Sequence, residues 1–140
     1  MRDLDDHPVH SSNYLGSVVV LNFWATWCPP CREEIPELNA FQTAHRNDGV
    51  VVVGASVDEG GATVVRDFVR RMKISYPVFL ADPSTQARYG GASTGPESTR
   101  LTLPTTVVID RKGNYAARYL GAITREELDK AVMPLLSTSR

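Results

Sequence analysis

A buried strand that runs directly into a pair of cysteines limits the fold of this chain more than any other feature. Residues 18–23 form an almost continuous apolar run rich in valine, which is typical of a strand buried on both faces. Residues 27–31 read Trp-Cys-Pro-Pro-Cys, and apolar side chains recur at helical spacing through residues 29–46. We therefore expect both cysteines to lie where a buried strand meets an amphipathic helix.

Cys28 and Cys31 are the only two cysteines in the chain, so no disulfide forms elsewhere within it. A helix that begins near Pro29 places Cys28 at its N-terminal boundary, where unpaired amide groups and the helix dipole stabilise a thiolate. Cys31 follows almost one turn later, within bonding distance but deeper in the protein. This spacing predicts a redox-active dithiol in which Cys28 is the nucleophile and Cys31 is the resolving thiol.

The residues around the two cysteines shape this chemistry. Pro29 and Pro30 have no N–H groups, so two donors that would stabilise the reduced form are missing. We infer from their absence a couple that reduces its partners rather than one that oxidises them. Trp27 is expected to lie against the exposed sulfur and to offer an apolar contact to those partners.

Two separated motifs make the chain resemble the thioredoxin superfamily, and within it the extracytoplasmic TlpA/ResA-like thiol–disulfide oxidoreductases. The motifs are residues 22–36, which include the cysteine pair, and residues 103–110, which read Leu-Pro-Thr-Thr-Val-Val-Ile-Asp. The resemblance covers residues 15–137. It implies an α/β thioredoxin fold, in which a central mixed β-sheet is flanked by helices on both faces.

The resemblance also implies that Leu103 and Pro104 form the cis-proline loop of the superfamily. In that family the loop lies against the cysteine pair, and the backbone groups of the residue before the proline pair with an extended substrate strand. The residues alone also allow an ordinary trans Pro104 at the start of the next strand.

One position departs from the common thioredoxin pattern. Many thioredoxins carry a buried aspartate six residues before the first cysteine, whereas this chain has Asn22, which cannot ionise. The resemblance to the TlpA/ResA-like branch implies a glutamate after the next strand as proton acceptor and donor for the dithiol. Glu59 is the best match and Asp58 the second. The alternative is that both acids form the solvated first turn of the following helix.

The rest of the chain follows an alternating strand and helix pattern. We expect strands at 50–56, 76–81, 105–110 and 115–120, and helices at 62–72, 84–89 and 124–136. Thr124 and Glu127 form the spacing of a capping box at the start of the last helix. Residues 90–102 are longer than the family pattern and rich in turn formers, which predicts a mobile surface loop. That loop either selects partners or is a tolerated insertion.

Composition sets the remaining limits. The 140 residues are 42% hydrophobic and 22% charged, as in an ordinary globular protein, and we expect a flexible segment at 1–14 before one domain at 15–140. The net charge of −1 argues against nucleic acid or an anionic membrane as a partner. Because the resembled relatives carry an export signal or anchor, we expect an extracytoplasmic, periplasmic or anchored protein whose signal is absent from this chain. A cytoplasmic location stays open.

These observations predict a monomeric thiol–disulfide oxidoreductase that uses no organic cofactor and no metal. Its partners would be disulfide-containing proteins and an upstream thiol reductase, and the resemblance points to cytochrome c maturation or general extracytoplasmic reduction. A peroxiredoxin-like peroxidase is one alternative, but its Pro-x-x-x-Thr-x-x-Cys site would need threonine where this chain has Ala25. A non-enzymatic metal-binding chaperone of the same fold is the other, and it would need further ligands beside the cysteines.

Overall fold

The computed structural model describes residues 1–89 and 102–136 of the chain. Its elements are η1 (Ser11–Tyr14), β1 (Val18–Trp24), α1 (Pro29–Ala44), β2 (Val50–Ser56), α2 (Ala62–Met72), β3 (Val78–Leu80), α3 (Pro83–Tyr89), β4 (Thr105–Ile109), β5 (Tyr115–Leu120) and α4 (Arg125–Leu136). The segment 90–101, on which the predicted surface loop falls, lies outside the described residues. β3 is shorter than predicted because Pro77 has no N–H to donate to the neighbouring strand.

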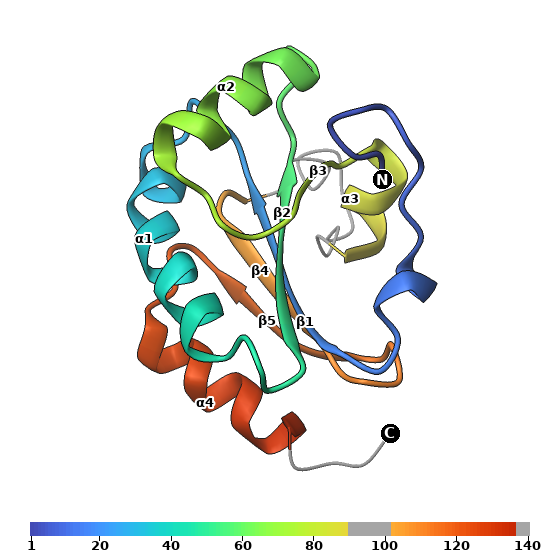
Figure 1. Ribbon diagram of the computed structural model, residues 1–140, viewed down its shortest axis with the longest axis vertical. Helices are drawn as coiled ribbons and strands as arrows, with labels where there is room; N and C mark the ends of the chain where they lie inside the picture. Colours follow the sequence, from blue (N-terminus) through green and yellow to red (C-terminus); the bar gives the residue numbers. More distant parts are fainter. Residues whose placement is uncertain (90–101, 137–140) are drawn as a thin grey trace.

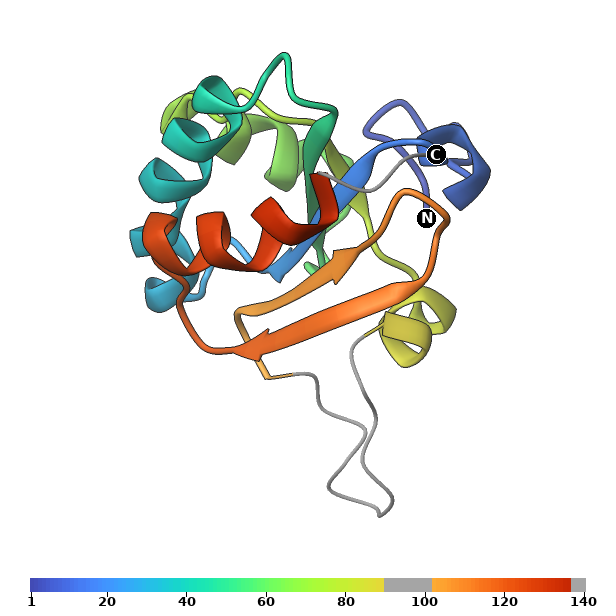
Figure 2. The ribbon, with the colours of Figure 1, turned by 90° about the horizontal axis from the view of Figure 1, so that it is seen from below.

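The five strands form one mixed sheet in the order β3-β2-β1-β4-β5. β1 pairs in parallel with β2 and antiparallel with β4, so the strand that leads to the cysteines occupies the centre of the sheet. All seven residues of β1 are buried, as the apolar run predicted. Helices α1, α2 and α4 cover one face of this sheet, and α3 lies on the other (Figures 1 and 2). The predicted α/β fold, a mixed sheet with helices on both faces, is confirmed.

The N-terminal segment, residues 1–14, pairs with the sheet through its backbone, and its expected flexibility stays a prediction. Arg2 and Leu80 exchange two backbone hydrogen bonds, at 3.1 and 2.7 Å, so the segment continues the sheet beyond β3. Val9 N–H donates to Met1 O at 2.9 Å, and a 3-10 turn follows at Ser11–Tyr14. The polar composition of this segment hid the pairing, because backbone groups and not side chains make it.

The last helix begins as its sequence predicted. Thr124 Oγ1 accepts from Glu127 N–H at 3.2 Å, and Glu127 Oε1 accepts from Thr124 N–H at 3.4 Å. These reciprocal bonds satisfy two of the amide groups that the first turn of α4 leaves without intrahelical partners. The predicted capping box is confirmed.

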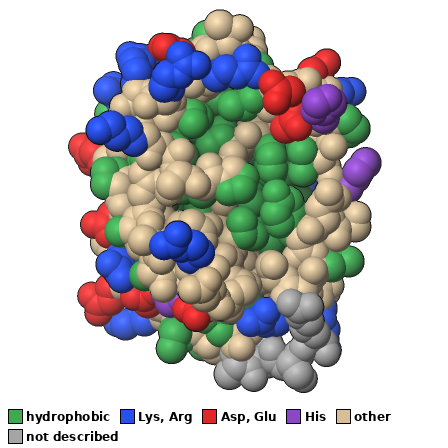
Figure 3. Space-filling view, viewed as in Figure 1, with side chains coloured by type: hydrophobic (Ala, Val, Ile, Leu, Met, Phe, Trp, Pro, Cys, Tyr) green, Lys and Arg blue, Asp and Glu red, His purple; other side chains and the backbone are tan. Residues whose placement is uncertain are grey.

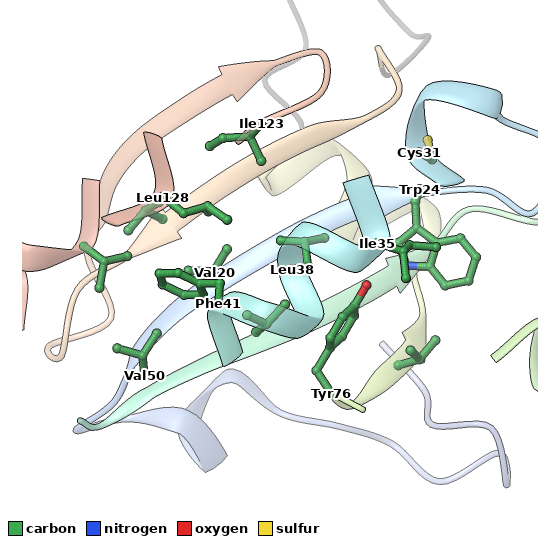
Figure 4. Close-up of a cluster of buried hydrophobic side chains, with 14 of the residues drawn as sticks. Val20, Trp24, Cys31, Ile35, Leu38, Phe41, Val50, Tyr76, Ile123 and Leu128 are labelled. Atoms are coloured by element: carbon green, nitrogen blue, oxygen red, sulfur yellow. The ribbon is translucent and has the colours of Figure 1, made fainter. Parts of the chain in front are cut away.

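Two apolar clusters fill the spaces above and below the sheet. The larger cluster lies under α1 and α4 and includes Trp24, Ile35, Leu38 and Phe41 (Figure 4). Both cysteines belong to it, and Figure 4 shows Cys31 at one end of the cluster, beside Trp24. The cysteine pair is therefore part of the larger of the two apolar clusters.

The opposite face of the sheet is less completely covered. Hydrophobic side chains show there between β2 and the N-terminal segment (Figure 3), beside a cavity of about 510 Å³ with Leu21 and Val53 in its lining. Neither cysteine lines this cavity. Among the helices of the described residues, none combines the length and the apolar character needed to cross a membrane.

Candidate active site

The cysteine pair forms a disulfide at the first turn of α1. Cys28 is the N-cap residue of the helix, and its Cα lies 5.3 Å from that of Cys31. Cys31 N–H points at the Cys28 sulfur, with a nitrogen–sulfur distance of 3.4 Å. Cys28 retains 4% exposure whereas Cys31 has none. The predicted pairing at the strand–helix junction is confirmed, and the difference in exposure matches the order of attack that the spacing predicts.

The outer side of the disulfide is apolar and open. Trp27 exposes 68% of its surface, and Pro29 and Pro30 are exposed beside it. These three side chains form an exposed apolar rim beside the disulfide, of the kind that protein partners can contact. The expected contact between Trp27 and the sulfur stays a prediction.

The Leu103–Pro104 peptide bond is cis, as the resemblance implied. Pro104 is buried, and its carbonyl oxygen accepts from Gly121 N–H at 2.8 Å, which joins the loop to the end of β5. Leu103 is half-buried and packs against the apolar cluster that contains both cysteines. The loop and the cysteine pair therefore border the same apolar cluster, and direct contact between them stays a prediction.

The two acids after β2 occupy different environments. Asp58 is half-buried and accepts hydrogen bonds from Thr26, two residues before Cys28. Glu59, the preferred candidate for proton transfer, is exposed, and none of the described hydrogen bonds or ion pairs involves its carboxylate. Its catalytic role stays a prediction that the geometry does not favour.

A third carboxyl group, Glu34, lies buried behind the disulfide with only 2% exposure. It follows Cys31 by three residues, so both side chains project from the same buried face of α1. Glu34 Oε1 accepts from Asn22 Nδ2 at 2.5 Å, and Oε2 accepts from Ile123 N–H at 3.1 Å. Asn22 also donates to Thr106 Oγ1 at 3.0 Å. A polar network thus lies under the active site, at the level where thioredoxins carry their buried aspartate.

Sequence reasoning missed Glu34, although one signal was present. Cys31, Glu34, Ile35 and Leu38 follow the spacing of a helix face that is otherwise apolar. A glutamate on such a face is unusual, because burying a carboxyl group is unfavourable unless it is hydrogen-bonded or neutral. That position marks it as a functional candidate.

Comparison with known proteins agrees with this geometry. The sequence profile of the AhpC/TSA family matches residues 1–118. The chain belongs to the AhpC/TSA family.

Proteins similar to this chain bear the names of thiol–disulfide exchange proteins. The chain is 32% identical over 129 residues to thiol-disulfide oxidoreductase ResA of Bacillus cereus, covering 92% of this chain and 69% of ResA. A thioredoxin-family thiol:disulfide interchange protein from Chlorobium tepidum superposes with a TM-score of 0.82 at 31% identity, covering 98% of this chain and 92% of the other. A secreted thiol-disulfide isomerase from Corynebacterium glutamicum gives 0.82 at 25% identity, covering 98% and 82%. This AhpC/TSA protein is a thiol–disulfide oxidoreductase of the thioredoxin superfamily, as the motifs predicted.

Burial sets the protonation of this oxidoreductase's internal carboxyl group. Removal from water raises the pKa of Glu34 to about 7, and the bonds from Asn22 and Ile123 oppose part of that rise. The phenol of Tyr76 is buried as well, and burial together with the nearby Glu34 raises its pKa above the usual value. Glu34 therefore exchanges its proton near neutral pH, which is the range in which a group can both accept and return one.

Proposed function

We propose that this protein reduces disulfide bonds in extracytoplasmic protein partners. Cys28, as a thiolate, attacks one sulfur of the partner's disulfide, forming a mixed disulfide and releasing the other partner sulfur as a thiolate, which takes up a proton. Cys31 then attacks the Cys28 sulfur, which frees the partner's second sulfur and leaves the Cys28–Cys31 disulfide. The partner gains two electrons, and an upstream thiol reductase returns two electrons to the pair.

The observation that carries this proposal is the placement of the two sulfurs at the start of α1. Cys28 lies at the helix N-cap with some exposure, and Cys31 is fully enclosed. The helix N-terminus favours the Cys28 thiolate, while the neighbouring prolines supply no N–H groups that would stabilise it further. A thiolate with fewer donors is a better reductant, because its reduced form is less stable.

Cys31 must lose a proton before it attacks, and we assign that proton to Glu34. The carboxyl group lies one turn further along the same buried face, and its raised pKa suits proton exchange near pH 7. Asn22 cannot take this part because an amide does not ionise. Glu59 is the competing candidate from the sequence, and its exposure weighs against it.

The partner class rests on family resemblance and on the open rim beside the disulfide. Haem-binding cysteines of apocytochrome c and other exported proteins with reducible disulfides are the proposed substrates. The likeness to a secreted isomerase supports an extracytoplasmic location.

The direction of electron flow is tested by the reduction potential of the Cys28–Cys31 couple, equilibrated against dithiol buffers of known potential. We expect a value below about −200 mV, because the prolines leave the thiolate with few donors. A value near about −120 mV, typical of a strong oxidant, would instead identify a disulfide donor.

A peroxidase activity is the alternative that the family's range suggests. Ala25 stands three residues before Cys28, is fully buried and has no hydroxyl with which to bind a peroxide. We therefore expect the reduced protein to consume hydrogen peroxide no faster than a free dithiol at equal concentration, measured by peroxide loss. Rapid multiple turnover would contradict the assignment.

The metal chaperone alternative lacks a ligand set in the described parts of the chain. Within residues 1–89 and 102–136, no three His, Cys, Asp or Glu side chains are grouped as metal ligands. A structural zinc site commonly has four such ligands, and the cysteine pair supplies two of them.

A further inference from the structure

The loop after β2 lies beside the loop that carries the cysteines. β1 and β2 run in parallel with Trp24 opposite Ser56, so the chain leaves both strands at the same edge of the sheet. Val57 N–H donates to Trp24 O at 2.9 Å and continues the pairing one residue beyond the strands. The residues that follow Ser56 are therefore next to those that follow Trp24.

Asp58 uses this position to hold Thr26. Both of its carboxylate oxygens accept from Thr26 N–H, at 3.0 and 3.2 Å, and Oδ1 also accepts from Thr26 Oγ1 at 2.6 Å. Oδ2 accepts from Ser56 Oγ at 2.7 Å. Four donor contacts occupy most of the acceptor capacity of one carboxylate. The Asp58 carboxylate therefore holds Thr26 in place.

Thr26 lies inside the turn that presents the nucleophile. Cys28 N–H donates to Ala25 O at 3.2 Å, which closes a turn with Thr26 and Trp27 at its centre. The amide of Thr26 takes no part in that bond and would be left without a protein partner in a half-buried place if Asp58 were absent. The hydroxyl contact then fixes the side chain as well, so the turn has little freedom to rotate.

We propose that Asp58 is a positioning residue for thiol–disulfide exchange: by holding Thr26 it keeps the Cys28 sulfur at the N-terminus of α1. The sulfur lies where Cys31 N–H points at it, and a thiolate there is stabilised by the first helical amides and by the helix dipole. A looser turn lets the sulfur leave this position and weakens that stabilisation. The role rests on exchange chemistry at the cysteine pair and is independent of the direction of electron flow.

Variants at Thr26 test the positioning role of Asp58 without altering its charge. Thr26→Val removes the Oγ1 donor without changing the net charge or much of the volume, whereas Thr26→Ser retains both donors to Asp58. Asp58→Asn removes the charge and retains one acceptor oxygen. Asp67, exposed on α2 and paired with Arg71 at 3.1 Å, supplies the matched carboxylate control as Asp67→Asn.

The test is the pH dependence of Cys28 alkylation by iodoacetamide in the fully reduced 140-residue chain, followed by mass spectrometry. We expect the pH midpoint of Cys28 alkylation to be about half a pH unit higher in Thr26→Val than in the wild type, the scale of one net hydrogen bond. Thr26→Ser and Asp67→Asn should keep the wild-type midpoint. Combining Thr26→Val with Asp58→Asn should shift the midpoint by less than the two single shifts added, because the variants share one contact.

Several outcomes would overturn the proposal. If Thr26→Val lowers the melting temperature but leaves the midpoint unchanged, Asp58 serves stability alone. If Thr26→Ser shifts as far as Thr26→Val, or the two shifts add fully, the contact between Thr26 and Asp58 is not the cause. Alkylation needs no partner protein, so these results do not depend on whether the protein acts as a reductant.

Discussion

Cys28→Ser is expected to abolish disulfide reduction, lowering the rate by about 10³-fold or more, because serine is a far weaker nucleophile than a thiolate. Cys31→Ser is expected to behave differently: it should form the mixed disulfide and then stop, because no second thiol can release the partner. The two variants together test the order of attack that the structure supports. Cys28 has the exposure that an attacking sulfur needs, and Cys31 has none.

The measurement uses a peptide that contains one disulfide, incubated with each reduced variant and examined by mass spectrometry without reductant. A covalent adduct with Cys31→Ser and none with Cys28→Ser is the expected pattern. Glu33→Gln, on the exposed side of α1, serves as a control that should turn over like the wild type. An adduct that forms with Cys28→Ser instead would reverse the two roles.

Local patterns in the sequence were sufficient to predict the frame of the active site. The apolar run of β1 and the Pro29 start of α1 are consecutive in the chain, so their junction follows from strand and helix rules alone. The cis bond before Pro104 was predicted from resemblance, since an X–Pro sequence allows both isomers. Each of these features depends on neighbours within a few residues or on a family motif.

The contacts that tune the site depend on distant residues and could not be predicted in the same way. Glu34 is buried against Asn22 and Ile123, and the latter is 89 residues away in the sequence. Asp58 meets Thr26 across 32 residues, and only the parallel register of β1 and β2 brings them together. The sequence indicated an acid near the dithiol, but the packing of α1 and α4 decides which acid is buried.

Glu34 should make the stability of the oxidised protein fall as the pH rises from about 4.5 to about 7. Its pKa is 4.5 in a solvated chain and about 7 in the folded protein, so the folded state binds more protons across this window. The stabilisation is complete below pH 4.5 and is lost as the pH passes through 7. A shift of this size corresponds to a loss on the order of 3 kcal/mol in the free energy of unfolding.

Glu34→Gln should remove this part of the pH dependence, because an amide does not titrate. The measurement is denaturant unfolding of wild type and variant at several pH values between 4 and 8, with the disulfide intact so that neither cysteine titrates. Glu33→Gln is the matched control, since the exposed neighbour should leave the wild-type slope unchanged. Parallel curves for wild type and Glu34→Gln would mean that folding leaves the pKa of Glu34 at its solvated value.

Glu34→Gln also tests whether Glu34 or Glu59 accepts the proton of Cys31 in catalysis. If Glu34 takes the proton of Cys31, Glu34→Gln should slow release of the partner by about 10²-fold at pH 7, the usual scale of a lost general base. Raising the pH should recover part of the rate, because Cys31 then loses its proton to solvent. Glu59→Gln should have little effect, since that carboxylate is exposed. The reverse result, a slow Glu59→Gln and an unaffected Glu34→Gln, would return the role to the acid predicted from the sequence.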